Sequence, residues 1–167
     1  NLLYSIVDRV YIGRIPGAGT EALGAVGLCF PVIILVTGFT NMFGLGGAPL
    51  FSMALGQGNR EKAIDIQNTA LRLLVLVGAG ILLVGELLGD RILLLFGATT
   101  GELSLALPYL RIYLIGTIFI MVSTGMNAYI NAQGFPVIGM ISVTIGAASN
   151  LILDPLFIFG WKLGVSG

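Results

Sequence analysis

The sequence has no histidine, one cysteine and few charged residues, and each shortage excludes a class of protein. Without histidine, a histidine-based metal site or proton relay is excluded. Cys29 is the single cysteine, so a disulfide framework within the chain is excluded, and its apolar neighbours indicate a small buried side chain. Eight basic and eight acidic residues balance to a net charge of zero, which argues against a nucleic-acid-binding surface.

Apolar residues are abundant in this chain, and charged residues are scarce. Hydrophobic residues make up 56% of the chain and charged residues 10%, whereas soluble domains have roughly a quarter of their residues charged. The 25 glycines are spread through the apolar stretches, as is typical of membrane helices that pack closely through small residues. The composition therefore predicts an all-α polytopic protein embedded in a lipid bilayer.

Long apolar runs separated by short polar loops divide the chain into five predicted membrane spans. The runs exceed the length of a strand and lack the alternation of a membrane barrel, so helices are expected. The first run is shorter than the about 20 residues that a crossing needs, and we expect it to be a truncated span. The predicted spans, within a single transmembrane lobe of residues 1–167, are residues 1–12, 22–55, 69–88, 103–132 and 135–159.

Two aspartates lie inside these apolar helices, where a carboxylate costs about 2.5 to 3.5 kcal/mol on insertion scales. Asp8 lies near the carboxyl end of the first predicted span, and Asp154 lies near the carboxyl end of the fifth. Three crossings separate these spans, so they run parallel and their carboxyl ends emerge on one side. At about 1.5 Å per residue, each aspartate lies roughly 8 Å below that surface. The two carboxyl groups are therefore expected to share one cavity.

Polar residues accompany both aspartates. Asn150 precedes Asp154 by four residues and Tyr4 precedes Asp8 by four, so each pair lies on one helix face. Asn127 lies inside the fourth span and is a further candidate. An ionised carboxyl in this setting needs a cation, and carboxylate, amide and hydroxyl oxygens suit a hard cation rather than a transition metal. The pattern predicts a site that binds a proton or a sodium ion.

Several motifs together resemble the amino-terminal lobe of a multidrug and toxic compound extrusion (MATE) transporter. The resemblance covers nearly the whole chain and implies twelve helices in two lobes, of which this chain contains helices one to five and the start of helix six. The motifs are Val7 to Gly13, Glu21 to Leu28, Leu55 to Asn59 with Ala63 and, as the most specific, Asn150 to Phe159.

The resemblance implies a secondary antiporter rather than an enzyme. It exports drugs, organic cations or metabolites in exchange for Na⁺ or H⁺ and needs no cofactor beyond this coupling ion. The implied partners are an amphiphilic small-molecule substrate, the lipid bilayer of a bacterial or archaeal cytoplasmic membrane, and a carboxy-terminal lobe, with no nucleic acid. The implied cation site consists of Asp8, Asn150 and Asp154, with Tyr4, Asn127 and Tyr109 as supporting polar residues.

Three other interpretations stay open at this point. A lipid-linked oligosaccharide flippase of related architecture moves a large anionic headgroup through a basic cavity, and the few arginines argue against it. An intramembrane aspartyl protease also needs two membrane aspartates, but the sequence has no Gly-x-Gly-Asp motif. A channel or a structural membrane protein explains the polar residues around the aspartates less economically.

Overall fold

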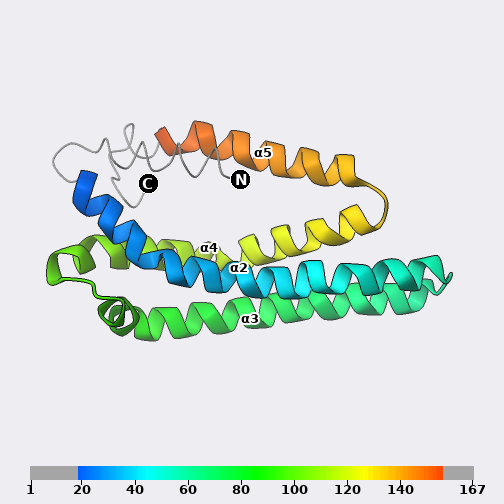
Figure 1. The fold of residues 1–167 in the computed structure, drawn as a ribbon, viewed down its shortest axis with the longest axis horizontal. Coiled ribbons are helices and arrows are strands. Elements are labelled where there is room, and N and C mark those ends of the chain that lie inside the picture. Colours follow the sequence, from blue (N-terminus) through cyan, green and yellow to red (C-terminus); the bar gives the residue numbers. More distant parts are fainter. Residues whose placement is uncertain (1–18, 156–167) are drawn as a thin grey trace. The chain divides into compact units, whose positions relative to one another are not determined.

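The computed structural model describes residues 19–155, with side chains described for residues 23–99 and 101–149. This part of the chain is all-α, as predicted (Figure 1). Three of its helices are long and apolar enough to cross a membrane, and the fourth contains a shorter apolar segment, Pro136–Ser149. The helices are α2 (Gly19–Gly56), α3 (Arg60–Leu95), α4 (Thr100–Ala132) and α5 (Pro136–Pro155).

Each of the four helices overlaps one predicted span, and α3 extends well beyond its span. The span is predicted at residues 69–88, whereas the helix begins at Arg60 and continues to Leu95. A helix satisfies its backbone hydrogen bonds internally, so it need not stop where apolar residues give way to polar ones. The predicted span at residues 1–12 lies outside the described residues, and the placement of the spans in lipid stays a prediction.

Three short turns join the four helices, and all three share one backbone design. A glycine with positive φ follows α2, α3 and α4 in turn: Gly58 (φ 73°), Gly97 (φ 91°) and Gly134 (φ 88°). The N–H of the next residue then reaches back five residues, as from Asn59 to the carbonyl of Ala54 (3.0 Å), and the equivalent bond occurs in the other two turns. This Schellman arrangement satisfies carbonyls at the helix end, and a residue with a side chain adopts the glycine conformation only with strain. Each turn is therefore determined by its own residues.

The helices that follow these turns are also capped locally. Asn59 accepts a hydrogen bond at Oδ1 from the N–H of Lys62 (3.0 Å). Thr99 and Glu102 form a capping box, in which Glu102 Oε2 accepts from the N–H (3.0 Å) and the hydroxyl (2.7 Å) of Thr99, while Thr99 Oγ1 accepts from the N–H of Glu102 (3.4 Å). Pro136 begins α5, where a missing N–H costs nothing. Capping thus sets the start of each of these helices.

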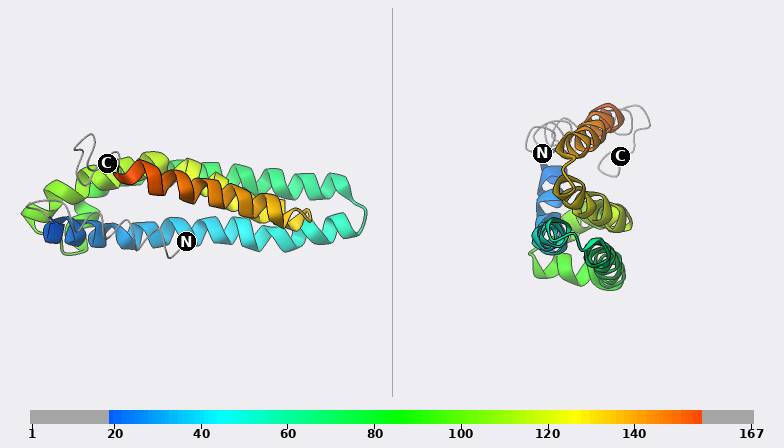
Figure 2. Two further views of the ribbon diagram at one scale, coloured as in Figure 1. Left: turned by 90° about the horizontal axis from the view of Figure 1, so that it is seen from above. Right: turned by 90° about the vertical axis from the view of Figure 1, so that its right-hand side faces the viewer.

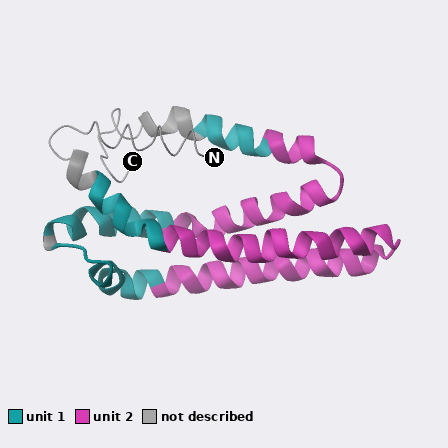
Figure 3. Ribbon diagram, viewed as in Figure 1, with its two compact units in different colours: residues 1–31, 85–113, 142–167 teal, residues 32–84, 114–141 magenta. Residues whose placement is uncertain are grey.

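The chain divides into two compact units, each assembled from separate segments of the sequence (Figure 3). Unit 1 comprises residues 1–31, 85–113 and 142–167, and unit 2 comprises residues 32–84 and 114–141. Every described helix contributes to both units.

In unit 1, side chains link the beginning of α2 and the end of α3 to the beginning of α4. Cys29 is buried, as its apolar neighbours predict, and its Sγ lies 3.5 Å from the carbonyl of Ala25 and 3.7 Å from that of Ala106. Arg111 on α4 pairs with Glu86 on α3 at 3.6 Å (Nε to Oε2). Both of these side chains are partly exposed, and the pair joins α3 to α4.

Unit 2 depends on close approach between helices at glycines. A Cβ at Gly44 would lie 2.9 Å from the Cα of Gly125, so α2 and α4 touch backbone to backbone. A Cβ at Gly125 would in turn lie 2.6 Å from Cδ1 of Leu74, so α3 fills the space beside the same glycine. Figures 1 and 2 show the unit 2 segments of α2 and α3 running side by side. Small residues therefore permit the contacts among all three helices.

Among the described residues, Tyr129 is the largest fully buried side chain, and it belongs to the core cluster of unit 2 together with Phe51 and Ala70. Its hydroxyl donates a hydrogen bond to the carbonyl of Phe43 (2.9 Å), and its ring meets that of Phe51 edge to face, with centroids 5.5 Å apart. A side chain at Gly47 would overlap the Tyr129 hydroxyl, so this glycine also makes room for the ring. Tyr129 thus joins α4 to α2 through both a polar and an apolar contact.

We expect Gly44→Ala to destabilise the protein by about 1–3 kcal/mol, because the new methyl group forces the backbones of α2 and α4 apart. Gly38→Ala is the matched control, since a Cβ at Gly38 meets nothing within 4 Å. The measurement is the apparent melting temperature of the full-length protein in detergent. Equal melting temperatures for the two variants would contradict the role assigned to Gly44.

We expect two substitutions of Tyr129 to differ in size. Tyr129→Phe removes only the hydrogen bond to Phe43, which is worth about 0.6 kcal/mol between membrane helices. Tyr129→Ala also empties the space of the ring and costs about 3–5 kcal/mol. Thermal unfolding of both variants checks this order, and a loss in Tyr129→Phe as large as in Tyr129→Ala would show that packing of the ring is unimportant.

Candidate functional site

The predicted cation site falls mainly at the edges of the described structure. Tyr4 and Asp8 lie outside the described residues. Asn150 and Asp154 lie on α5, which is helical through Pro155, and the structure describes their backbone but not their side chains. The structure therefore does not test whether these residues meet.

Asn127 is described in full and makes a polar contact between two helices. Its Nδ2 donates to the carbonyl of Gly139 on α5 (3.0 Å), and its Oδ1 accepts from Nδ2 of Asn131, one turn further along α4 (3.2 Å). A Cβ at Gly139 would overlap Oδ1 of Asn131, so α5 can approach this pair only through a glycine. Among residues 136–149 of α5, Gly139 alone is buried, and the residues on either side of it are exposed. Asn127, held by Asn131, thus attaches α5 to α4 through a hydrogen bond.

Tyr109, the other supporting residue, lies elsewhere on α4. It is partly buried and belongs to the part of α4 in unit 1, whereas Asn127 belongs to unit 2. The place of Tyr109 in the predicted site stays a prediction.

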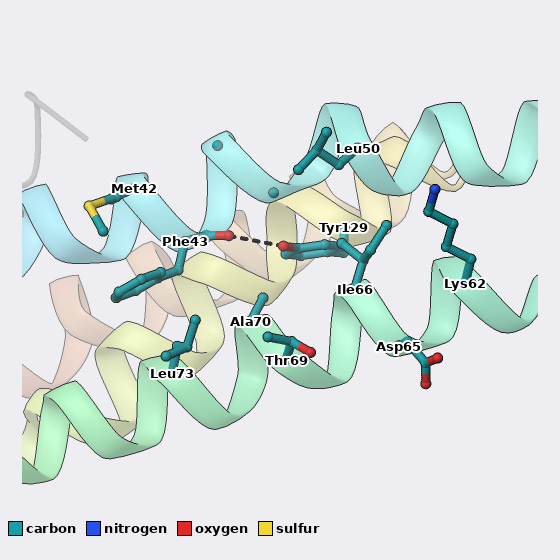
Figure 4. Close-up of a pocket in the computed structure, with 12 residues that line it drawn as sticks. Met42, Phe43, Leu50, Lys62, Asp65, Ile66, Thr69, Ala70, Leu73 and Tyr129 are labelled. Carbon is teal, nitrogen blue, oxygen red and sulfur yellow. Dashed lines mark hydrogen bonds between the residues drawn. The ribbon is translucent and has the colours of Figure 1, made fainter.

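A groove in unit 2 was not predicted from the sequence. It has a volume of about 480 Å³ and lies between α2 and α3, with Tyr129 of α4 at its inner wall (Figure 4). Its sides are mainly apolar, and Lys62 and Asp65 lie at the end nearest the turn between α2 and α3. The apolar lining includes Met42, Phe43 and Leu50 from α2, and Ile66, Ala70 and Leu73 from α3.

The groove is difficult to predict from the sequence. Lys62 belongs to a polar loop segment that is readily interpreted as solvated, and Asp65 lies three residues further along. Only the spacing of Lys62, Asp65, Ile66, Thr69 and Leu73, at intervals of three and four residues, indicates that they share one face of α3. That signal does not reveal that α2 leaves the face uncovered.

No cluster of metal-ligating side chains occurs among the described residues. Carboxylates with oxygen-bearing neighbours are suited to hard cations such as Na⁺. A proton or sodium ion at the predicted Asp8, Asn150 and Asp154 site is compatible with this chemistry, and it is taken up below as a proposal.

Comparison with known proteins gives consistent matches across the chain. The "Multidrug export protein MepA" of Staphylococcus aureus (strain MRSA252) is 28% identical over 167 residues, which is 100% of this chain and 37% of the relative. The protein of the same name from Staphylococcus haemolyticus is 27% identical, again over the whole chain and over 36% of its own length. The chain thus spans little more than a third of these relatives. Their names do not favour the flippase alternative.

Solved structures match the fold equally well. The crystal structure of a MATE protein in complex with MaD3S aligns with a TM-score of 0.91 and 26% identity, over 99% of this chain and 36% of that one. A MOP superfamily transporter from Pyrococcus furiosus aligns with a TM-score of 0.89 and 27% identity, also over 99% and 36%. These shares agree with an amino-terminal lobe of a two-lobe architecture.

The membrane-length helices and the staphylococcal relatives identify an integral protein of the bacterial cytoplasmic membrane. The motifs in the sequence, the all-α fold and the solved structures all agree with the predicted resemblance. The family model MatE matches residues 1–156, and this chain therefore belongs to the MatE family.

Proposed function

We propose that this chain is the amino-terminal lobe of a secondary antiporter that exports drugs, organic cations or metabolites in exchange for Na⁺ or H⁺. The observation that carries the proposal is the alignment of the entire chain with staphylococcal multidrug export proteins. MatE proteins are transporters, so transport rather than catalysis is the activity to test. The substrate is an amphiphilic small molecule, and a carboxy-terminal lobe completes its path.

The coupling ion binds at Asp8, Asn150 and Asp154 in this proposal. The helical backbone of α5 supports it, because residues four apart, such as Asn150 and Asp154, lie one turn apart on one face. A carboxylate in an apolar environment is costly unless it is paired, so binding a cation or proton there is favourable. If the affinity differs between the inward-facing and outward-facing states, the ion gradient drives the exchange.

Asn127 serves this site as a positioning residue. Its hydrogen bond to Gly139 attaches α5 to α4 at a point about 16 Å along the helix from Asn150, at 1.5 Å per residue. Asn131 holds the Asn127 amide in place from the other side. This arrangement supports an indirect role, in which Asn127 sets the position of the helix that carries Asn150 and Asp154. Tyr4 and Tyr109 complete the proposed supporting set.

We expect Asp154→Asn to reduce gradient-driven efflux to the level of protein-free liposomes, because a neutral amide cannot exchange a proton or balance the charge of a cation. The measurement uses the full-length protein in proteoliposomes, a fluorescent amphiphilic cation as substrate, and sodium and pH gradients imposed separately. The gradient that drives efflux in the unaltered protein identifies the coupling ion.

Glu61→Gln is the matched control for Asp154→Asn, since it makes the same chemical change at an exposed residue in the first turn of α3. It should transport normally. Normal efflux by Asp154→Asn under either gradient would contradict the proposed site, and efflux that ignores both gradients would contradict antiport itself.

We expect Asn127→Ala to raise the ion concentration for half-maximal efflux about threefold, the equivalent of ~0.6 kcal/mol for one hydrogen bond between membrane helices. Ser123→Ala is the control on the same helix, because the Ser123 hydroxyl bonds to Ile120 within α4. An unchanged half-maximal concentration, together with a lower melting temperature, would assign Asn127 to helix packing alone.

A further inference from the structure

One face of α4 in unit 2 carries hydrogen-bonding side chains at helical spacing. Its four members follow one another at intervals of seven, three and four residues, which places them within about 80° of one another around the helix axis. From the first to the last, the face extends about 21 Å along the helix, or about two thirds of the hydrocarbon core of a bilayer. We call it the polar face of α4, and its members are Thr117, Thr124, Asn127 and Asn131.

The polar face differs in composition from the faces that suit lipid. The exposed positions of α3 in unit 2 include Leu76 and Leu83, and the far side of α4 exposes Ile115 and Phe119. In hydrocarbon, a hydroxyl or an amide loses its hydrogen bonds to water without replacing them. The polar face of α4 therefore suits another helix, water or an ion rather than lipid.

Helix packing accounts for only part of the polar face. Asn127 is half-buried and bonds to Gly139 of α5, whereas Thr124 and Asn131 are exposed. The hydroxyl of Thr40 on α2 donates to the carbonyl four residues earlier in its own helix, but among the described residues the hydroxyl of Thr124 has no such partner. Asn131 uses its Nδ2 to donate to Asn127, which leaves its Oδ1 as an acceptor. Oxygen atoms of both exposed side chains are therefore available to a ligand.

These oxygen atoms suit a cation that passes rather than one that stays. Hydroxyl and amide oxygens are ligands of hard cations such as Na⁺, and they also bind bridging water. The sequence of α4 has no charged residue between Arg111 and the end of the helix at Ala132. Without a carboxylate the face binds a cation weakly, and conduction requires sites that an ion can both enter and leave. The polar face thus has the chemistry of a route rather than of a second storage site.

The same spacing continues along α4 to a residue of the proposed cation site. Tyr113 and Tyr109 precede Thr117 at intervals of four residues on this helix, and Tyr109 belongs to the proposed supporting set. At the other end, Asn131 lies in the last turn of α4, beside the turn of residues 133–135. Polar side chains therefore recur along α4 from a supporting residue to this turn.

We propose that the polar face of α4 lines a hydrated route along which the coupling ion, Na⁺ or H⁺, moves between the cation site and the membrane surface at residues 133–135. The route presupposes the antiport proposed above and assigns a path to its ion. Thr124 and Asn131 offer oxygen atoms to the ion or to its water, while Asn127 both attaches α5 and borders the route.

The test measures whether water reaches residue 124 in the full-length protein. A single cysteine replaces Thr124 after Cys29 and any other native cysteine have been changed to alanine. Sealed vesicles are exposed on one side at a time to a membrane-impermeant cationic methanethiosulfonate, which reacts with a thiolate and therefore requires water. Phe119→Cys is the matched control on the far side of α4, and Gln133→Cys marks the side of the membrane on which the turn lies.

We expect Thr124→Cys to react about tenfold faster than Phe119→Cys, because the thiolate forms in water and not in hydrocarbon. The reaction should occur from the same side of the membrane as that of Gln133→Cys, since the route opens at residues 133–135.

We also expect Thr124→Val to lower the maximal rate of gradient-driven efflux about threefold, the value of one polar contact within a membrane protein. This substitution keeps the shape of the side chain and removes its oxygen. Ser123→Ala is the control, since it removes the neighbouring hydroxyl, which bonds to Ile120 within α4.

Three results would overturn the proposal. Equal reaction rates of Thr124→Cys and Phe119→Cys would show that the polar face is dry, and reaction only from the side opposite to Gln133→Cys would contradict the position of the opening. Unchanged efflux by Thr124→Val would show that the hydroxyl does not serve the ion. Labelling needs no transport, so a dry polar face together with loss of efflux in Asp154→Asn would overturn the route and leave the cation site standing.

Discussion

Contact between helices at glycines is the constraint on which unit 2 depends. In a bilayer, removing apolar side chains from water contributes nothing to helix association, so close van der Waals contact and interhelical hydrogen bonds must stabilise it. Gly44 and Gly125 let α2 and α4 touch, and Gly125 also admits Leu74 of α3. This closeness brings the Tyr129 hydroxyl within reach of the Phe43 carbonyl. Glycine also keeps the groove open, because Gly46 and Gly47 leave space where larger residues would fill it.

Much of the helical architecture could be predicted from the sequence because its signals are local. Apolar runs longer than a strand predict membrane helices, and glycines before polar or proline residues mark the turns. The ends of α3 are less evident from hydropathy, because the helix runs from Arg60 to Leu95 and so extends beyond the predicted span of residues 69–88. Hydropathy indicates where lipid contact ends, but helical hydrogen bonding can continue into water.

The candidate sites were predictable to different degrees. Asp154 and Asn127 are conspicuous because a polar side chain in an apolar run is costly. The partner of Asn127 could not be foreseen, since it is the backbone carbonyl of Gly139, and every residue has a carbonyl. The groove forms between the faces of α2 and α3 that remain uncovered beside Tyr129. Its position therefore depends on how α2, α3 and α4 pack together. Sequence periodicity describes one helix at a time and cannot supply it.

The three Schellman turns have a consequence for biosynthesis. Each closes with hydrogen bonds among residues that are neighbours in the chain, ending on Gly58, Gly97 or Gly134, and needs no contact with a distant segment. A helical hairpin can therefore form as soon as its two helices have left the ribosome, before the remainder of the protein is made. The helical hairpins can then insert into the membrane in the order in which they are synthesised, so the topology of the chain is determined during synthesis. Later assembly only has to bring finished hairpins together.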